Sequence, residues 1–376
     1  MILLTPSLIW IVPVFICAFH VFYDNLWPED HNTQQYNHTG ILNLFLFLHL
    51  PASMALMAVL LWQITPGDLM GMGKLLDEMF HFNILDIHEQ LGWIELVSIS
   101  LVVGFMLSTN TIVGHELTHR TNDKLSMIVG RWVLAIVGDA QFSISHVYGH
   151  HVNVGTENDS VTAKRGESLY RFTLRSSLGQ YSEAWIIEKN RLGNKNQPVL
   201  SLQNRVITGL LMTAAIVVLF IMFAGWFGLL AFCLHFLVAK FLYEAVNYIE
   251  HYGLVREVGK KVESRHSWDC NTRAATYVLF SLSRHSDHHA NATRPFWEVE
   301  AQTNSAATIR HGYIAQILVA SFPPLWHRYI TPQLLQWDQK MATIEERRLV
   351  QKANLSSKIE ALVLSTQNAP TNNGTI

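Results

Sequence analysis

The chain has 376 residues, of which 49% are hydrophobic and 15% are charged. A soluble domain carries about 25% charged residues, so this composition favours an integral membrane protein with a substantial water-facing part. The formal net charge of -2 gives no electrostatic reason to expect nucleic acid as a partner. The three scattered cysteines argue against a disulfide framework.

Five apolar runs are long enough to cross about 30 Å of hydrocarbon as helices. They predict spans at residues 3–23, 41–64, 91–113, 206–223 and 227–243. The last two spans form a hairpin that turns at Gly225 and Trp226. A weaker run at 123–140 predicts a short membrane-surface or re-entrant helix. The predicted fold is therefore an all-α membrane helix bundle of about five transmembrane helices.

The distribution of Lys and Arg predicts the orientation of the bundle. Residues 114–205 hold eleven of them and residues 244–310 hold eight, whereas the loops at 24–40 and 65–90 hold only Lys74. By the positive-inside rule, the two rich regions face the cytoplasm. We expect three spans in 1–113, a cytoplasmic region at 114–205, a membrane hairpin at 206–246, a second cytoplasmic region at 247–340 and a polar tail at 341–376. The tail is Asn-, Thr- and Gly-rich from about Gln367, which predicts disorder there.

Nine of the 19 histidines lie in four short stretches, HELTH, HVYGHH, NYIEH and HSDHH. On a helix, i,i+3 and i,i+4 spacing places side chains on one face, so the histidines within a stretch could point in one direction. Nine imidazoles are too many for one ion, since zinc is filled by about four ligands. They suit two ions of iron, copper or zinc, held in a cytoplasmic helical cap. The candidate metal ligands are His115, His119, His146, His150, His151, His251, His285, His288 and His289.

The first stretch also matches the HExxH signature of zinc metalloproteases. In that reading His115 and His119 bind zinc and Glu116 activates a water molecule. The other three stretches argue against it, because a protease needs one further ligand rather than seven more histidines. A membrane zinc protease is therefore kept only as a remote alternative.

Further side chains near the histidines are candidates to hold an imidazole by its free N–H. These candidates are Glu116, Asp159, Glu244, Glu250, His266 and Asp287. No catalytic residue beyond the metal ligands is expected. On the third span, Gly104, Ser108 and Thr109 could leave room for an apolar substrate. The remaining histidines are expected to be ordinary structural or surface residues: His20, His31, His38, His49, His81, His88, His235, His311 and His327.

The set HELTHR, HVYGHH, NYIEHYGLVR and SRHSDHHA resembles the integral-membrane di-iron alkane 1-monooxygenases. Xylene monooxygenase hydroxylase subunits are a close branch, and both belong to the wider fatty acid desaturase/hydroxylase group. The resemblance runs from about the third span through His311. The stretches NYIEHYG and HSDHH favour the alkane branch, whereas Pro324-Leu-Trp and Trp337-Asp-Gln are similar to the xylene branch. Two features depart from the alkane enzymes: they usually have six spans, of which the first is missing here, and Ser145 stands where they commonly have Glu.

The resemblance implies that the nine histidines hold two iron ions and that the chain hydroxylates the terminal methyl of medium-chain alkanes with O2. It implies a bacterial inner membrane with the active site on the cytoplasmic side. It also implies electrons from a rubredoxin or a ferredoxin-type donor with its NAD(P)H reductase, since the chain has no CxxC pair and no GxGxxG stretch of its own.

Three other functions stay open. Two keep the di-iron site: a xylene-type aromatic methyl hydroxylase, and an acyl-lipid hydroxylase or desaturase. The third is a membrane metal-binding or transport protein. The expected place of the histidines at span ends disfavours transport, because the ligands of a transporter lie near the bilayer midplane.

Overall fold

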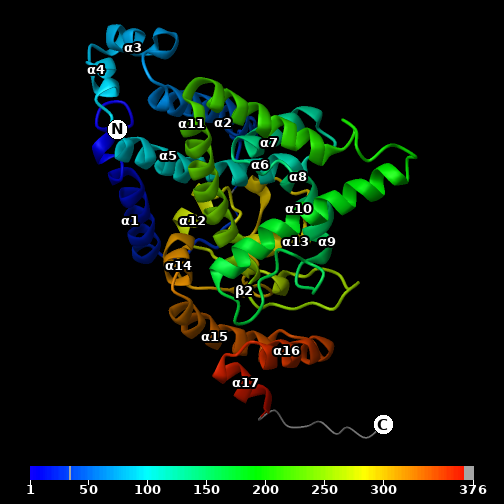
Figure 1. Ribbon diagram of the computed structural model, residues 1–376. Coiled ribbons are helices and arrows are strands. Elements are labelled where there is room, and N and C mark those ends of the chain that lie inside the picture. The colour runs from blue at the N-terminus through cyan, green and yellow to red at the C-terminus, as the bar shows by residue number, and fades with distance from the viewer. Residues whose placement is uncertain (34, 368–376) are drawn as a thin grey trace, which may run out of the picture.

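The computed structural model describes residues 1–33 and 35–367 (Figure 1). The fold is all-α, as predicted, apart from a two-residue parallel pair, β1 (Trp268–Asp269) and β2 (Ala307–Thr308). The predicted disorder beyond Gln367 lies outside the described residues. The helices up to residue 200 are α1 (Ile11–Leu26), α2 (Thr39–Ile64), α3 (Met72–Phe80), α4 (Ile84–Glu89), α5 (Trp93–Leu107), α6 (Thr109–His119), α7 (Lys124–Ile136), α8 (Phe142–Ser145), η3 (His146–His150), α9 (His151–Asn153) and α10 (Leu169–Gly193).

After residue 200 the chain forms one long helix and then a series of short ones. They are α11 (Arg205–His251), α12 (Arg273–Val278), α13 (His285–Ala290), α14 (Tyr313–Ala320), α15 (Pro323–Lys340), α16 (Ile344–Ser356) and α17 (Glu360–Gln367). Short 3-10 turns lie at Pro6–Leu8, Leu69–Gly71, Ser264–His266 and Phe296–Glu298. The segment expected as a polar tail therefore contains two helices, α16 and α17.

Four helical stretches among the described residues are long and apolar enough to cross a membrane. They are Pro6–Leu26, Thr39–Ile64, Trp93–His119 and Arg205–His251. The third stretch combines α5 and α6, so the helix that contains the predicted span 91–113 continues through His115 and His119. The chain is therefore an integral membrane protein whose first two site histidines lie at the C-terminal end of a helix that is long enough to span the membrane.

The predicted hairpin corresponds to a break within α11. Gly225 has φ 59° and ψ -143°, a conformation that is essentially restricted to glycine. The rings of Phe220 and Phe232 are 6.1 Å apart. A Cβ at Gly228 would lie 2.0 Å from the carbonyl oxygen of Phe220, so the chain doubles back at Gly225. The two arms, 205–224 and 226–251, run in different directions in Figure 1.

The second arm of α11 packs closely along α5. A Cβ at Gly104 would lie 2.5 Å from the carbonyl oxygen of His235, so only glycine permits this approach. Around it, Ile99 and Val103 of α5 share a buried cluster with Ala239 of α11. We expected Gly104 to leave room for a substrate, but it instead allows two backbones to touch.

A second core joins the short helices that follow α11. The side chains of Trp268, Trp326 and Trp337 are 2%, 0% and 1% exposed. A buried aromatic side chain removes about 150–250 Å² from water, which stabilises the fold by roughly 4–6 kcal/mol before chain entropy is deducted. Arg165 donates to both oxygens of Asp338 at 2.7 and 2.6 Å and so fastens α15 to the loop before α10. Figure 1 shows α15, α16 and α17 at the end of the molecule opposite α2 and α3.

Candidate metal centre

The structure brings all nine predicted ligands together in two groups. The ligand atoms within each group lie within 4.8 Å of one another. The five-histidine group is His115, His119, His146, His151 and His288, and the four-histidine group is His150, His251, His285 and His289. The groups adjoin, since the ring centroids of His151 and His289 are 4.4 Å apart. The arrangement is therefore a single site with two centres.

Two of the helical pairs follow the i,i+4 spacing as predicted. His115 and His119 lie one turn apart on α6, with ring centroids 4.8 Å apart. His285 and His289 lie one turn apart on α13, with 3.0 Å between their Nε2 atoms. The third histidine of that helix, His288, joins the five-histidine group instead. Neighbouring residues on α13 therefore serve different centres.

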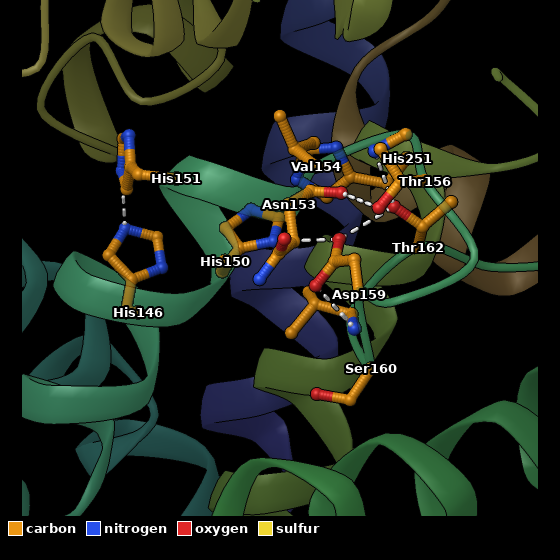
Figure 2. Close-up of polar contacts among 12 residues, drawn as sticks. His146, His150, His151, Asn153, Val154, Thr156, Asp159, Ser160, Thr162 and His251 are labelled. Carbon is orange, nitrogen blue, oxygen red and sulfur yellow. Dashed lines mark hydrogen bonds and ion pairs between the residues drawn. The ribbon is translucent and has the colours of Figure 1, made fainter. Parts of the chain in front are cut away.

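The stretch HVYGHH differs from the prediction in two ways. We expected α-helical spacing within this stretch, but residues 146–150 form the π-turn η3, which continues into α9. Five residues advance an α-helix by about 500°, which would turn His151 away from His146, whereas the wider i→i+5 turn brings the two into line. Their Nε2 atoms lie 3.0 Å apart, and a dashed line in Figure 2 marks this contact. The expectation that His146 and His150 share a direction is wrong, because His150 belongs to the four-histidine group.

The inward-facing nitrogens are too crowded to be satisfied by hydrogen bonds alone. The Nε2 atom of His146 lies 3.1 Å from that of His119 and 3.0 Å from that of His151, which in turn lies 3.1 Å from that of His288. A neutral imidazole carries one N–H, so these three contacts cannot all be hydrogen bonds. The Nε2 atom of His115 is buried and has no partner among the described residues. Metal–nitrogen bonds of about 2.0–2.1 Å at right angles would place two nitrogens about 3 Å apart, so this crowding fits a bound cation.

The protonation state of the site also suits metal binding. Burial lowers the pKa of the imidazoles outside the spans well below its ordinary value, and neighbouring imidazoles lower it further. These residues are His146, His151, His285, His288 and His289. The neutral imidazole is the form that binds a metal. A donor set made only of imidazoles suits iron, copper or zinc, so the residues present fit two such ions.

Asp159 lies outside the four-histidine group and holds the imidazole of His150, which is a member of it. Its carboxylate accepts a hydrogen bond from Nδ1 of His150 at 2.9 Å and another from the hydroxyl of Thr162 at 2.6 Å (Figure 2). Burial alone would raise the pKa of Asp159, but His150 and these hydrogen bonds hold it below its ordinary value. The ionised carboxylate keeps the proton on Nδ1 and leaves Nε2 of His150 to face the centre.

Glu250 approaches the site from the inner side. Its Oε2 atom lies 3.4 Å from Nε2 of His285, the nitrogen that also faces His251 at 3.0 Å. Its Oε1 atom accepts a hydrogen bond from the hydroxyl of Tyr313 at 3.1 Å. We expected Glu250 to hold an imidazole by its outer N–H, but it instead faces the same space as the ligand nitrogens.

The other predicted helpers have partners outside the nine histidines. Glu116 pairs with Arg120 at 2.9 Å, and Glu244 pairs with Lys240 at 2.8 Å and accepts from Gln180 at 2.7 Å. His266 bonds Glu346 at 2.7 Å. Asp287 accepts from Asn291, Arg294 and Gln302 at 2.8–3.0 Å. In the structure, Glu244 therefore forms an ion pair within α11. His266 fastens α16, and Asp287 orders the loop after α13.

Two residues that sequence reasoning missed hold the histidine-bearing segments. Asp269 accepts hydrogen bonds at 2.7 Å from both the backbone N–H and the hydroxyl of Ser286, in the first turn of α13. Arg256 donates to the carbonyls of Val152 and Val154, directly after His151, at 2.6 and 2.7 Å. Both residues stand among other charged and polar residues, so the sequence around them carries no signal that marks them.

An apolar cavity of about 350 Å³ lies beside the site. Its walls come from α1, α5, α6, α11, α12 and α14 and the residues next to them. Ser108 and Thr109, which we expected to leave room for a substrate, line it, and so does His20, which we treated as ordinary. Tyr313, the partner of Glu250, is also in its wall.

Comparison with known proteins places the chain in a family. The fatty acid desaturase profile matches residues 91–316, which include all nine histidines. Alkane 1-monooxygenase 1 of Pseudomonas aeruginosa is 37% identical over 250 residues, which cover 65% of this chain and 64% of that protein. Alkane 1-monooxygenase of Pseudomonas putida is 32% identical over 256 residues, which cover 66% and 63%. These alignments span just under two thirds of the relatives' length.

A relative from the other branch aligns over more of its length. The xylene/toluene monooxygenase hydroxylase component of Pseudomonas putida is 30% identical over 271 residues, which cover 70% of this chain and 73% of that protein. The resemblance inferred from the four histidine stretches is therefore confirmed by the family match over residues 91–316 and by 30–37% identity to these relatives. This chain belongs to the fatty acid desaturase family and is similar to its alkane 1-monooxygenases.

Proposed function

We propose that the chain is a membrane-bound non-heme di-iron monooxygenase that hydroxylates the terminal methyl of medium-chain alkanes with O2. The observation that carries this proposal is the convergence of nine imidazoles in two adjoining groups beside an apolar cavity. The names of the alkane 1-monooxygenases that align with about two thirds of the chain support the same reaction. Two iron ions held by these histidines would supply the reduction of O2 and the oxidation of a C–H bond.

The chain's own residues fix the positions of the imidazoles and exclude water. His150, His251 and His285 are 0%, 1% and 2% exposed, so the four-histidine group is closed to bulk solvent, whereas His119 and His151 of the five-histidine group are partly exposed. Asp159 fixes the orientation of His150, and Asp269 fixes the first turn of α13. A dry and rigid site favours reaction with a bound substrate over side reactions with water.

The apolar cavity suits a hydrocarbon. Its volume of about 350 Å³ lies within the range of about 300–1,000 Å³ that is common for small-molecule sites. Tyr313 joins its wall to Glu250, which lies 3.4 Å from His285. An apolar pocket separates neighbouring chain lengths by only about 1–3 kcal/mol per methylene, so we expect a range of alkanes to be accepted.

Electrons would come from a rubredoxin or a ferredoxin-type donor with its NAD(P)H reductase. The sequence has only Cys17, Cys233 and Cys270, with no CxxC pair to hold an iron–sulfur centre. The excess of Lys and Arg in residues 114–205 and 244–310 supports a cytoplasmic site, where such donors work. The bacterial sources of the relatives support the inner membrane as the location.

Two alternatives keep the same site. A xylene-type aromatic methyl hydroxylase is favoured by the alignment with the xylene/toluene monooxygenase component. An acyl-lipid hydroxylase or desaturase is favoured by the breadth of the fatty acid desaturase family. A zinc protease is disfavoured, because Glu116 is paired with Arg120 at 2.9 Å rather than free to activate water. It is also disfavoured by the five imidazoles that meet beside it.

Product analysis tests the proposal. Membranes with the full chain, in a host that supplies rubredoxin and its reductase, would be given octane, p-xylene and acyl lipids separately, and the products would be identified by mass spectrometry. We expect O2-dependent formation of 1-octanol, which His119→Ala abolishes. Oxidation of p-xylene alone, or an unsaturated acyl chain alone, would favour the corresponding alternative, and no O2-dependent product from any substrate would overturn the proposal.

A further inference from the structure

Two voids lie between the apolar spans and the five-histidine group, and they share lining residues. The larger is the apolar cavity of about 350 Å³. The smaller, of about 10 Å³, lies against His115, Glu116 and His288. Ile112 and Leu279 line both voids. These two side chains therefore stand between the hydrocarbon-sized cavity and the imidazoles.

Ile112 is held in place by a buried helix. It lies on α6 three residues before His115, and residues three apart on a helix share one face. Its side chain is only 8% exposed. A β-branched side chain on a helix has one strongly preferred rotamer. Ile112 is therefore a rigid wall one turn from the first site histidine.

Leu279 is held by a strained turn. It ends α12, and the next two residues, Phe280 and Ser281, have φ of 50° and 55°. Residues with a side chain rarely adopt this left-handed conformation, and it persists where the surroundings enforce it. Here the N–H of Ser281 bonds the carbonyl of Thr276 at 2.7 Å, and the ring of Phe280 packs 5.1 Å from that of Phe296.

We propose that Ile112 and Leu279 form a constriction that admits only a slim chain end to the five-histidine group and so determine which carbon is presented there. The inference rests on the proposed function and deepens it, since it names the two side chains that would select an unbranched chain end. Strain beside a site often marks a segment whose shape matters to function. The left-handed turn keeps Leu279 in the wall of both voids.

The size of the smaller void supports this substrate class. A void of about 10 Å³ is close to the least that holds one water molecule. A methyl group at the end of a chain is the smallest part of a hydrocarbon that could enter such a space with little displacement of the walls. An aromatic ring could reach His115 and His288 only if Ile112 or Leu279 moved aside. The constriction therefore favours alkanes over xylenes.

The test compares Ile112→Ala and Leu279→Ala with the unmodified chain, in membranes that contain the electron donor. The readouts are the ratio of 1-octanol to 2- and 3-octanol and the ratio of oxidised p-xylene to oxidised octane. A pocket contact of one or two methylene groups separates substrates by about 10–200-fold. We expect each variant to raise the share of in-chain alcohols and to raise the xylene-to-octane ratio by about 10-fold.

Ile317→Ala is the matched control. Ile317 is 9% exposed and lines the larger cavity, so its truncation removes the same groups at similar burial, but it does not line the smaller void. We expect this control to change the affinity for octane without changing the position of hydroxylation. Ile112→Val and Leu279→Val are conservative variants that should fold normally and give smaller shifts in the same direction. The iron content per chain should stay equal in all variants.

The outcomes separate the constriction from the proposed function. If the unmodified chain forms no O2-dependent product, the proposed function fails. If it forms 1-octanol and the variants at positions 112 and 279 form the same products in the same ratios, the constriction is wrong and the proposed function stands. The same shift in Ile317→Ala as in Ile112→Ala would also overturn the constriction. Density for 1-bromooctane in the zinc-loaded chain gives a readout without turnover, and we expect its methyl end between Ile112 and Leu279.

Discussion

The Nε2 atoms of His146 and His151 lie 3.0 Å apart although the two residues are five positions apart on one helical segment. The π-turn at residues 146–150 makes this possible, and it leaves His150 facing the other group. One short segment therefore supplies imidazoles to both groups. The two candidate ion positions are therefore joined through the backbone of residues 146–151.

Removal of one imidazole from either group should lower the number of metal ions bound per chain. We expect His119→Ala and His251→Ala each to lower the metal content from about two ions per chain toward one, because each group loses one of its imidazoles. Inductively coupled plasma mass spectrometry on the purified full chain measures this.

His88→Ala is the control for these two variants. His88 is also buried, at 7% exposure, but it belongs to neither group and bonds the carbonyl of Gly67. Its substitution should leave the metal content unchanged. Two ions per chain in both His119→Ala and His251→Ala would contradict the assignment of these residues as ligands.

Asp159→Asn should weaken metal binding without removing a ligand. The substitution keeps the shape of the side chain but loses the charge that holds the Nδ1 proton of His150. Loss of such an outer partner typically costs about 10–100-fold in metal affinity, which competition with a chelator would measure. Asp338→Asn is the matched control, because Asp338 pairs with Arg165 and does not contact the site. Equal chelator resistance of Asp159→Asn and the unmodified chain would show that His150 needs no such partner.

Lys240→Met should destabilise the helix bundle. Lys240 lies 3.0 Å from Asp139 and 2.8 Å from Glu244, and all three side chains are at most 6% exposed. Removal of one partner from a buried ion pair costs about 3–5 kcal/mol, because a charge is left uncompensated. The midpoint of thermal unfolding in detergent would show the loss. Adding Asp139→Asn and Glu244→Gln to Lys240→Met should restore part of it, and no restoration would mean that packing rather than charge dominates.

Glu346→Gln should lower stability but leave the metal content intact. Glu346 accepts a hydrogen bond from His266 at 2.7 Å. His266 is not one of the nine histidines of the candidate metal centre. Burial alone would raise its pKa, but His266, the backbone N–H of Thr343 and Arg265 lower the pKa from 4.5 to about 2. The ionised form therefore stabilises the folded chain above about pH 4.5, and this contribution disappears as the pH falls toward 2.

The pH dependence supplies the readout for that variant. Between about pH 4.5 and 2 the unfolding free energy of the unmodified chain should fall more steeply than that of Glu346→Gln, since the variant has no carboxyl to protonate. Parallel pH profiles would contradict the role of Glu346. A loss of metal in Glu346→Gln would instead indicate that His266 supports the metal ligands as an outer hydrogen-bond partner.

Hydropathy and spacing predicted the elements that depend on local sequence. The spans follow from runs of about 20 apolar residues, and the break at Gly225 follows from the conformational freedom of glycine. The pairs His115/His119 and His285/His289 follow from the 3.6-residue period of a helix. These features depend on residues within one or two helical turns of each other, so they can be predicted from the sequence alone.

The features that were missed depend on contacts between distant segments. The π-turn at residues 146–150 has no recognised sequence signature, so the division of His146, His150 and His151 between two centres could not be predicted. Glu244 was expected beside an imidazole, but Lys240 on the same helix is the nearer partner. Asp269 acquires its role only when residue 286 folds against it. Each of these outcomes is decided by packing rather than by periodicity.

The metal content of the purified full chain tests the central claim most directly. Iron and zinc would be measured together against protein concentration, after expression with both metals supplied. The proposed di-iron function, with nine imidazoles in two adjoining groups, predicts about two irons per chain and no stoichiometric zinc. A single zinc ion per chain, or fewer than one metal ion of any kind, would contradict the account.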